Sequence, residues 1–221
     1  MQIHLVRHGQ TRWNAERRIQ GQLDTELDET GREQARALAP TLAALDVGAV
    51  YCSTSVRTRQ TAALALAPAN PDIVYRDELR EIRLGAWEGR LWSEVELEDR
   101  TMTERLRDAD PAFEVENAEG YPELQRRGVA AIERIIGERA ADVVLVVSHG
   151  ALIKSVLAHY TDEPLGTLRS LPSLPNCAHS VLEADGDGRR VTRIGGEPIE
   201  ETPWGRGSRS SRTSASEAPA H

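Results

Sequence analysis

The hydrophobic positions of this chain follow two kinds of pattern that alternate along it. Short continuous apolar runs, rich in β-branched residues, indicate strands that are buried on both faces. These runs lie at 2–6, 47–52, 73–75 and 143–147. Apolar residues spaced three and four positions apart predict helices at about 30–45, from 56 onward, at 122–140 and at 151–160. The alternation predicts an α/β sandwich with the 143–147 strand in the middle of a mostly parallel sheet.

Two stretches between these elements lack a regular period. Residues 11–24 are polar and predict a loop with short helical turns. Residues 92–120 are rich in charged side chains, with Trp92, Met102 and Phe113 as sparse apolar positions. We expect this second segment to pack over the edge of the sheet as a lid.

Two sequence signals concern the ends of predicted elements. Thr30 is followed three residues later by Glu33, which predicts a capping box at the start of the first long helix. The runs 178–184 and 189–194 flank a turn rich in Gly and Asp and predict a hairpin.

Residues 200–221 show no period and are rich in Ser, Arg, Gly and Pro, so we expect a disordered tail. The remaining residues, 1–199, predict one domain that includes the lid-like insertion at about 92–120.

The composition narrows the possible classes of protein. The 221 residues carry a formal net charge of -8, which disfavours binding to nucleic acid. No apolar run is long enough to cross a membrane and no signal sequence is recognisable, so we expect a cytoplasmic protein without membrane contact. The two cysteines, Cys52 and Cys177, form neither a disulfide framework nor a metal cluster. The sequence leaves a homodimer open.

Polar residues with chemical potential follow the predicted strands. Arg7 and His8 come directly after the first apolar run, His149 and Gly150 follow the fourth run, and Arg57 begins the helix after the second run. The carboxyl ends of parallel strands meet at one edge of a sheet, where ligands bind. Two arginines and two histidines suit phosphoryl transfer, because a neutral imidazole can attack phosphorus while guanidinium groups bind its oxygens. Taken alone, the first strand end fits a solvated polar turn equally well.

Spaced motifs resemble those of one known family. Arg7–His8–Gly9–Gln10–Thr11 resembles the signature of the histidine phosphatase superfamily, which is also called phosphoglycerate mutase-like. The match continues in the same order over residues 1–195. It includes Asn14, Arg18–Ile19–Gln20–Gly21, Thr30–Gly31–Arg32–Glu33–Gln34–Ala35, Arg57 with Gln60–Thr61–Ala62, Leu79–Arg80–Glu81, and Val147–Ser148–His149–Gly150. The resemblance implies a three-layer α/β/α sandwich around a mostly parallel sheet.

The resemblance also implies a role for each matched residue. His8 corresponds to the nucleophile that becomes phosphohistidine, and Glu81 to the acid that protonates the leaving oxygen and later activates water. The other matched residues fall into two groups. Arg7, Arg57 and His149 correspond to groups that bind the transferred phosphoryl group, and Asn14, Gln20, Gly21 and Gly150 to positions in the substrate site. The family's reaction implies no metal and no organic cofactor.

Three candidate functions remain open. The first is a phosphatase that hydrolyses a small phosphorylated metabolite, because Gly85 and Trp87–Glu88–Gly89 resemble the phosphatase branch. The second is a 2,3-bisphosphoglycerate-dependent phosphoglycerate mutase, which returns the same phosphoryl group to the substrate. The third is a regulatory binding protein of this fold with low activity. Because the lid at 92–120 is more acidic than basic, we expect it to repel the second phosphate that a mutase must hold.

Some positions depart from the family pattern or lie outside it. Ser53, Thr54 and Ser55 stand where a Ser-Ser-Asp sequence is frequent, which leaves the substrate contacts open. His4 and His179 match no motif, so we expect them to be structural or solvated.

Overall fold

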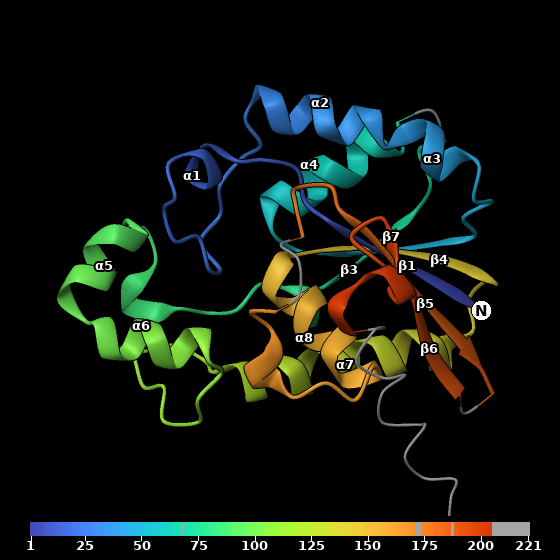
Figure 1. The fold of residues 1–221 in the computed structure, drawn as a ribbon. Helices are drawn as coiled ribbons and strands as arrows, with labels where there is room; N and C mark the ends of the chain where they lie inside the picture. Colours follow the sequence, from blue (N-terminus) through green and yellow to red (C-terminus); the bar gives the residue numbers. More distant parts are fainter. Residues whose placement is uncertain (68, 171–173, 187, 205–221) are drawn as a thin grey trace, which may run out of the picture.

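The computed structural model describes residues 1–67, 69–170, 174–186 and 188–204. Its strands form one seven-stranded sheet in the order β3-β2-β4-β1-β5-β6-β7 (Figure 1). They are β1 (Gln2–Arg7), β2 (Ala49–Ser53), β3 (Ile73–Arg76), β4 (Val143–Ser148), β5 (His179–Asp185), β6 (Gly188–Ile194) and β7 (Glu197–Pro198). The first four strands pair in parallel, and the last three pair antiparallel. The predicted strands and hairpin are therefore present, and the short β7 extends the hairpin.

Helices cover both faces of the sheet, as Figure 1 shows. One face carries α2 (Glu29–Ala37), α3 (Ala39–Ala43) and α4 (Val56–Ala65), and the other carries α7 (Tyr121–Glu138) and α8 (Gly150–Tyr160). The central strand β4 contributes to the hydrophobic core on both faces of the sheet, because its successive side chains point to opposite faces. Val144 and Val146 belong to one buried cluster, and Val147 belongs to the other. The structure confirms the predicted three-layer α/β/α sandwich with a mostly parallel centre.

The register of the central strands brings the two predicted histidines together. β1 and β4 run in parallel with Arg7 opposite Ser148, so the next residues, His8 and His149, leave the sheet side by side. The backbone N–H of His8 donates to the carbonyl of Ser148 at 3.0 Å, which continues the ladder past the last paired residues. The imidazole rings lie edge to face with their centroids 5.3 Å apart. Strand pairing alone therefore brings the two histidines of the predicted site together.

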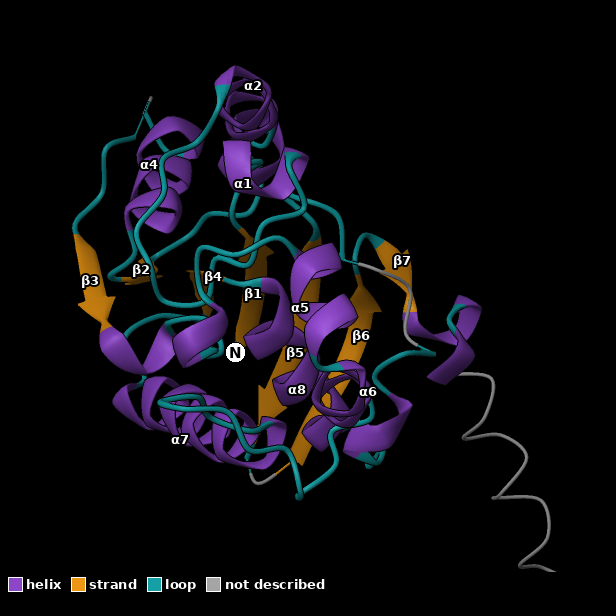
Figure 2. Ribbon diagram, turned by 90° about the vertical axis from the view of Figure 1, so that its left-hand side faces the viewer, coloured by secondary structure: helices purple, strands orange, loops and turns teal. Residues whose placement is uncertain are grey.

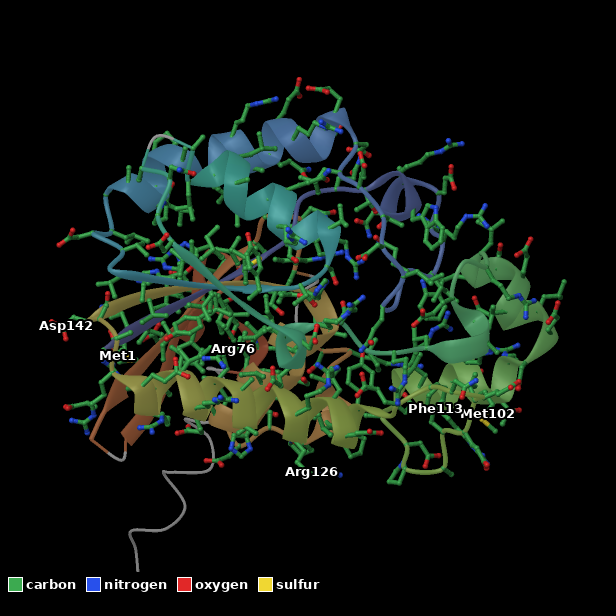
Figure 3. All side chains as sticks on the ribbon, turned by 180° about the vertical axis from the view of Figure 1, so that it is seen from behind. Met1, Arg76, Met102, Phe113, Arg126 and Asp142 are labelled. Carbon is green, nitrogen blue, oxygen red and sulfur yellow. The ribbon has the colours of Figure 1, made fainter. Side chains whose placement is uncertain are left out.

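The segment that follows the third strand extends over the carboxyl edge of the sheet. It contains α5 (Trp92–Glu98) and α6 (Arg100–Arg107), and its neighbour across the edge is α1 (Arg12–Ala15). In Figure 2, which faces this end of the molecule, α5 and α6 lie nearest to the viewer. Figure 3 places Met102 and Phe113 at this end, far from Met1 and Asp142 at the opposite end of the sheet. Both residues pack against the main hydrophobic cluster and anchor this segment to the domain.

Four short 3-10 helices connect the larger elements in the described residues. They are η1 (Asp77–Leu79), η2 (Gly85–Trp87), η3 (Leu165–Thr167) and η4 (Ile199–Glu201).

The first long helix differs from its prediction in two respects. Its N-cap is Asp28, whose carboxylate accepts from the backbone N–H of Gly31 at 2.8 Å, and Thr30 lies within the first turn. The expected single helix over 30–45 is divided at Leu38 into α2 and α3. Pro40 lies in the first turn of α3 and lacks the N–H that would continue the α2 ladder, which explains the division.

The expected tail begins later than the composition indicated. Residues 200 and 201 belong to η4, Thr202 is fully buried, and Trp204 is only 3% exposed within the main hydrophobic cluster. The apolar surface of one indole therefore holds this segment against the domain, although the surrounding sequence is polar. Residues 205–221, the rest of the expected tail, lie outside the described residues.

Candidate active site

A small cavity of about 140 Å³ lies at the carboxyl edge of the sheet, at the end that Figure 2 faces. It brings together most of the site residues that the sequence predicted. They are Arg7, His8, Asn14, Gln20, Gly21, Arg57 and Glu81, and the rest of the wall comes from Arg18, Ile19, Ile82, Leu84 and Trp92. His149 lies behind this wall, against the ring of His8, and Gly150 lies against the guanidinium of Arg7.

The His8 ring is held in one tautomer by the backbone. Its Nδ1 is 2.7 Å from the carbonyl oxygen of Gly9, so Nδ1 carries the proton and Nε2 keeps its lone pair. The ring is 2% exposed, and burial together with the nearby charges of Arg57 and Arg7 lowers the pKa of His8 well below its ordinary value. His8 is therefore a neutral imidazole with an unprotonated Nε2, which is the form that a nucleophile requires.

Close packing against α2 and α4 fixes the turn after His8. The Gly9 N–H donates to the hydroxyl of Thr61 at 3.0 Å. A Cβ on Gly9 would lie only 2.5 Å from the carbonyl oxygen of Gly31 in α2. A glycine is therefore required where this turn meets α2, which accounts for the Arg-His-Gly sequence at this strand end.

The two predicted arginines are held by backbone carbonyl groups. Arg57 is fully buried, and its guanidinium donates to the carbonyls of Leu23 at 2.9 Å and Gly21 at 2.7 Å. Burial lowers the pKa of Arg57 to about 10, so the group stays charged at neutral pH. Arg7 donates to the carbonyl of Leu174. These contacts fix each guanidinium in place and leave other N–H groups free.

Several buried donors around the cavity have no protein partner. Among the described residues, seven buried side-chain nitrogen or oxygen atoms lack a hydrogen bond. Four of them belong to this region: Arg7 Nε, Arg57 Nε, Arg80 Nε and His149 Nδ1. An unsatisfied buried polar group costs about 1–3 kcal/mol, so a concentration of them at one place indicates a site prepared for an anion.

Ser53 supports the second histidine and was not identified as a site residue from the sequence. Its hydroxyl lies 2.9 Å from Nε2 of His149, and its oxygen accepts from the Ser55 N–H at 3.4 Å. The Ser53 hydroxyl also lies 3.5 Å from the Ser55 hydroxyl, so its contact with Nε2 fixes the His149 ring and leaves Nδ1 as the ring nitrogen without a protein partner. Burial, with Arg57 as the nearest charge, lowers the pKa of His149 well below its ordinary value. His149 thus offers one neutral N–H donor.

Backbone N–H groups orient the predicted acid, Glu81. One carboxylate oxygen accepts from Ile82 at 3.0 Å and from Leu152 at 3.1 Å. The other accepts from Ala151 at 3.1 Å. Ala151 and Leu152 belong to the first turn of α8, where N–H groups are free to bind an acceptor. Glu81 is therefore fixed at the cavity wall, between the acidic motif and the second histidine motif.

The predicted substrate-binding amides are oriented by donors behind them. The Asn14 oxygen accepts from the Thr11 N–H at 3.1 Å and from the Asn176 amide at 3.3 Å. The Gln20 oxygen accepts from the hydroxyls of Thr11 at 2.9 Å and Thr25 at 2.7 Å. With their oxygens engaged, both amides have N–H groups available for a ligand.

Two further residues near the site were given no role by the sequence. Asn176 donates to the carbonyl of His8 at 3.1 Å as well as to Asn14. It precedes β5 at a position that no motif marks. Arg80 stands inside the acidic motif, and its charge contributes to the lowered pKa of His149. The partly buried Arg80 guanidinium donates to the carbonyl of Gln22 at 2.5 Å, so a third arginine whose role the motif match did not assign lies near the site.

Gly21 is needed for two reasons. Its φ is +50°, a left-handed conformation that favours glycine, and a Cβ there would lie 2.0 Å from a carboxylate oxygen of Glu88. That same oxygen accepts from the N–H groups of Gln22 and Leu84 at 3.0 and 2.9 Å. Glu88 thus ties the loop that carries Gly21 to the acidic-motif segment.

A larger cavity of about 790 Å³ adjoins the small one, and its walls bear on the expected charge of the lid. Of the acidic residues between 92 and 120, only Glu96 is on this wall in the described structure, and it pairs with Arg107 at 2.7 Å. Glu16, Arg17 and Arg18 also line the cavity, and Glu16 pairs with Arg18 at 3.2 Å. The charged residues on this wall are therefore not acidic on balance. This lining does not support the expectation that the lid repels a second phosphate, which stays a prediction.

Other histidines and acidic residues do not form a metal centre. No group of three or more His, Cys, Asp or Glu that could hold a metal is present in the part of the chain that the structure describes. His4 and His179 lie on neighbouring strands with Nδ1 and Nε2 2.8 Å apart, so they are a structural pair within the sheet. No helix among the described residues has the length and apolar character needed to cross a membrane.

Comparison with known proteins identifies the class that this fold and site define. The family model of the histidine phosphatase superfamily (branch 1) matches residues 3–196. The chain belongs to this superfamily, as the spaced motifs indicated.

Curated relatives and solved structures agree with this assignment. The chain is 33% identical over 183 residues to a protein of Photorhabdus laumondii named probable phosphoglycerate mutase GpmB, covering 83% of this chain and 85% of the relative. An Escherichia coli protein of the same name matches to the same extent. Among solved structures, YhfR of Bacillus stearothermophilus is 34% identical with a TM-score of 0.83, covering 89% of this chain and 96% of that one. A mycobacterial glucosyl-3-phosphoglycerate phosphatase is 25% identical with a TM-score of 0.81, covering 89% and 99%.

Proposed function

We propose that this protein is a phosphomonoesterase that hydrolyses a small phosphorylated metabolite through a phosphohistidine at His8. The observation that carries the proposal is the ring of unpaired buried donors around a neutral imidazole. Arg7, Arg57 and His149 each present a nitrogen without a protein partner, and His8 presents Nε2 with its lone pair. A phosphoryl group is the anion that satisfies these donors and also reacts with the imidazole.

The reaction divides into two displacements at phosphorus. In the first, Nε2 of His8 forms a bond to phosphorus while the bond to the ester oxygen breaks, and protonated Glu81 gives its proton to the leaving alcohol. In the second, a water oxygen attacks phosphorus, Glu81 takes the water proton, and the P–N bond electrons return to Nε2. Nδ1 of His8 keeps its proton throughout, because the Gly9 carbonyl accepts it.

The residues around the reacting group bind and position it. Arg7 and Arg57 neutralise the phosphoryl oxygens, and Nδ1 of His149 donates to one of them. The free amide groups of Asn14 and Gln20 face the same cavity. No step of this reaction needs a metal, so we expect chelators to leave the activity unchanged.

A phosphoglycerate mutase is the second candidate, because curated relatives carry that name. It uses the same phosphohistidine, and it differs in passing the phosphoryl group to a phosphoglycerate rather than to water. The large adjoining cavity and the likeness to a phosphatase of a bulkier phosphoglycerate ester favour hydrolysis. A binding protein without turnover is the third, and the complete set of reacting residues disfavours it.

Rapid quenching with a ³²P-labelled phosphomonoester tests the proposal. We expect a protein-bound label that is labile in acid and stable in base, and His8→Ala abolishes both the label and phosphate release. His159→Ala serves as the control, because His159 is an exposed histidine on α8 away from the cavity. Labelling that persists in the His8 variant would overturn the covalent mechanism.

A second assay separates hydrolysis from transfer. Phosphate release and interconversion of 2- and 3-phosphoglycerate are followed side by side, with and without 2,3-bisphosphoglycerate. We expect phosphate release to dominate. Interconversion that outruns phosphate release would replace the phosphatase assignment by the mutase.

A further inference from the structure

The large cavity next to the catalytic one is the feature that the proposed mechanism does not use. It has a volume of about 790 Å³, against about 140 Å³ for the catalytic cavity. Asn14, Arg18 and Trp92 line both, so the two spaces adjoin. A pocket of roughly 300–1,000 Å³ is the size that holds a ligand of several hundred daltons. A three-carbon acid would leave most of this space empty.

The walls of this outer cavity are joined by backbone hydrogen bonds. In the loop after β1, the N–H of Ile19 donates to the carbonyl of Arg90 at 2.8 Å. In the opposite direction, the N–H of Trp92 donates to the carbonyl of Arg17 at 3.1 Å. The Arg18 guanidinium adds a bond to the carbonyl of Gly89 at 2.6 Å. The space between loop and lid is therefore built into the fold and exists before a ligand arrives.

Aromatic rings form much of the apolar wall. Trp13 comes from α1 and Trp92 from the start of α5, and both are only partly buried. Trp92 is held edge to face against Trp87, with centroids 6.4 Å apart, and Trp87 is held in the same way by Phe113. Tyr121 lines the cavity at the start of α7. Rigid rings with free surface are suited to packing against a flat ring of a ligand.

The charges of the outer cavity do not cancel. Arg18 pairs with Glu16 at 3.2 Å, and Arg107 pairs with Glu96 at 2.7 Å. Arg17 is exposed, and its guanidinium makes no hydrogen bond or ion pair to any described residue. The wall therefore presents one uncompensated positive charge, two residues after the helix α1 that carries Trp13.

We propose that the outer cavity selects phosphomonoesters whose alcohol part carries a flat ring and a separate anionic group. The phosphoryl group occupies the small cavity, the ring packs against Trp13 and Trp92, and the anionic group meets Arg17. This assignment rests on the proposed phosphomonoesterase activity and specifies its substrate class.

Two pairs of substrates test the proposal, because each pair differs in one property. Phenyl phosphate and 1-naphthyl phosphate have leaving groups of similar acidity and differ in ring area. 4-Carboxyphenyl and 4-carbamoylphenyl phosphate have similar shape and differ in charge. We expect kcat/KM to be about 5- to 10-fold higher for the naphthyl ester, as ring packing provides. We expect it to be roughly 3-fold higher for the carboxylate than for the amide, as one exposed ion pair provides.

Substitutions assign each preference to its residue. Trp13→Ala removes the preference for the naphthyl ester, and Arg17→Gln removes the preference for the carboxylate. Arg139→Gln is the matched control, since Arg139 is also an exposed arginine with positive φ, +47° against +53°, and lies outside both cavities. It leaves both ratios unchanged.

The outcomes distinguish the two proposals. If phenyl phosphate is hydrolysed but neither the naphthyl ester nor the carboxylate is preferred, the proposed substrate class is wrong and the proposed phosphatase activity is retained. Preferences that survive Trp13→Ala and Arg17→Gln also overturn it, because the selection then arises elsewhere. Absence of phosphate release and of a His8 label from every ester overturns the phosphatase and, with it, the substrate class.

Discussion

Gly21 offers a demanding test of how the site is held together. Gly21→Ala places a Cβ 2.0 Å from the Glu88 carboxylate, which must move by about 1.5 Å to reach ordinary contact. It also puts a side chain at φ +50°, which costs about 1–2 kcal/mol. Moving Glu88 weakens its bonds from Gln22 and Leu84, and a hydrogen bond to a charged group contributes about 1.5–3 kcal/mol. The expected total is about 3–5 kcal/mol.

A second glycine isolates the contribution of the contact. Gly186, in the turn between β5 and β6, has φ +52° and nothing within 4 Å of its Cβ position. Gly186→Ala therefore carries only the conformational cost. In a chain of this size, about 2–4 °C of Tm corresponds to 1 kcal/mol, so we expect Gly21→Ala to melt about 5–10 °C below Gly186→Ala.

Catalysis responds to the same change through Arg57. The carbonyl of Gly21 accepts from the Arg57 guanidinium at 2.7 Å, so a shifted Gly21 moves the group that binds the phosphoryl oxygens. A misplacement of about 1 Å lowers kcat/KM by roughly 100-fold, whereas Gly186→Ala keeps full activity. Phosphate release and differential scanning fluorimetry measure both effects. Equal melting of the two variants, or normal kcat/KM in Gly21→Ala, would refute the reasoning.

Three further predictions address the second histidine, acid stability and the end of the domain. Ser53→Ala removes the hydroxyl that positions the ring of that histidine and lowers kcat/KM about 10-fold, whereas the buried control Ser155→Ala does not; equal kinetics in the two would contradict this role. Burial lowers the pKa of His179 from 6.5 to about 4, so the unfolded chain binds the extra proton as pH falls from 6.5 toward 4, and stability is lost in that window. The urea midpoint should fall less steeply with pH in His179→Gln, and an unchanged slope would exclude this group. Trp204→Ala costs about 3–5 kcal/mol and lowers Tm by about 6–20 °C, whereas deletion of residues 205–221 leaves it unchanged.

The sequence by itself determined the architecture and predicted which residues lie at the candidate site. Continuous apolar runs define buried strands, and the residues that follow such runs must leave the sheet at its carboxyl edge. Arg7, His8 and His149 could therefore be assigned to one place from local pattern alone. The spaced motifs added Arg57 and Glu81, which belong to elements that the chain order brings to the same edge.

Local signals near element ends were less informative. Thr30 and Glu33 form a plausible capping box, yet Asp28 caps the helix. The two possible N-cap residues stand only two positions apart, and the packing of Gly31 against Gln10 favours Asp28. The polar composition after residue 200 concealed Trp204, whose burial depends on a hydrophobic surface formed by distant segments. A single large apolar side chain can outweigh the composition around it.

Only the tertiary structure decided the state of the reacting groups and the chemistry around them. The Gly9 carbonyl selects the tautomer of His8, and Ser53 approaches His149 across two neighbouring strands. The unpaired donors and the open charge of Arg17 depend on which side chains face each other. Net charge along a segment does not contain that information, which is why an acidic lid contributes only a paired Glu96 and Arg107 to the charge of the cavity wall. Sequence spacing specifies where a residue leaves its strand or helix, but hydrogen bonds and charge pairs form between elements that meet only in the folded chain.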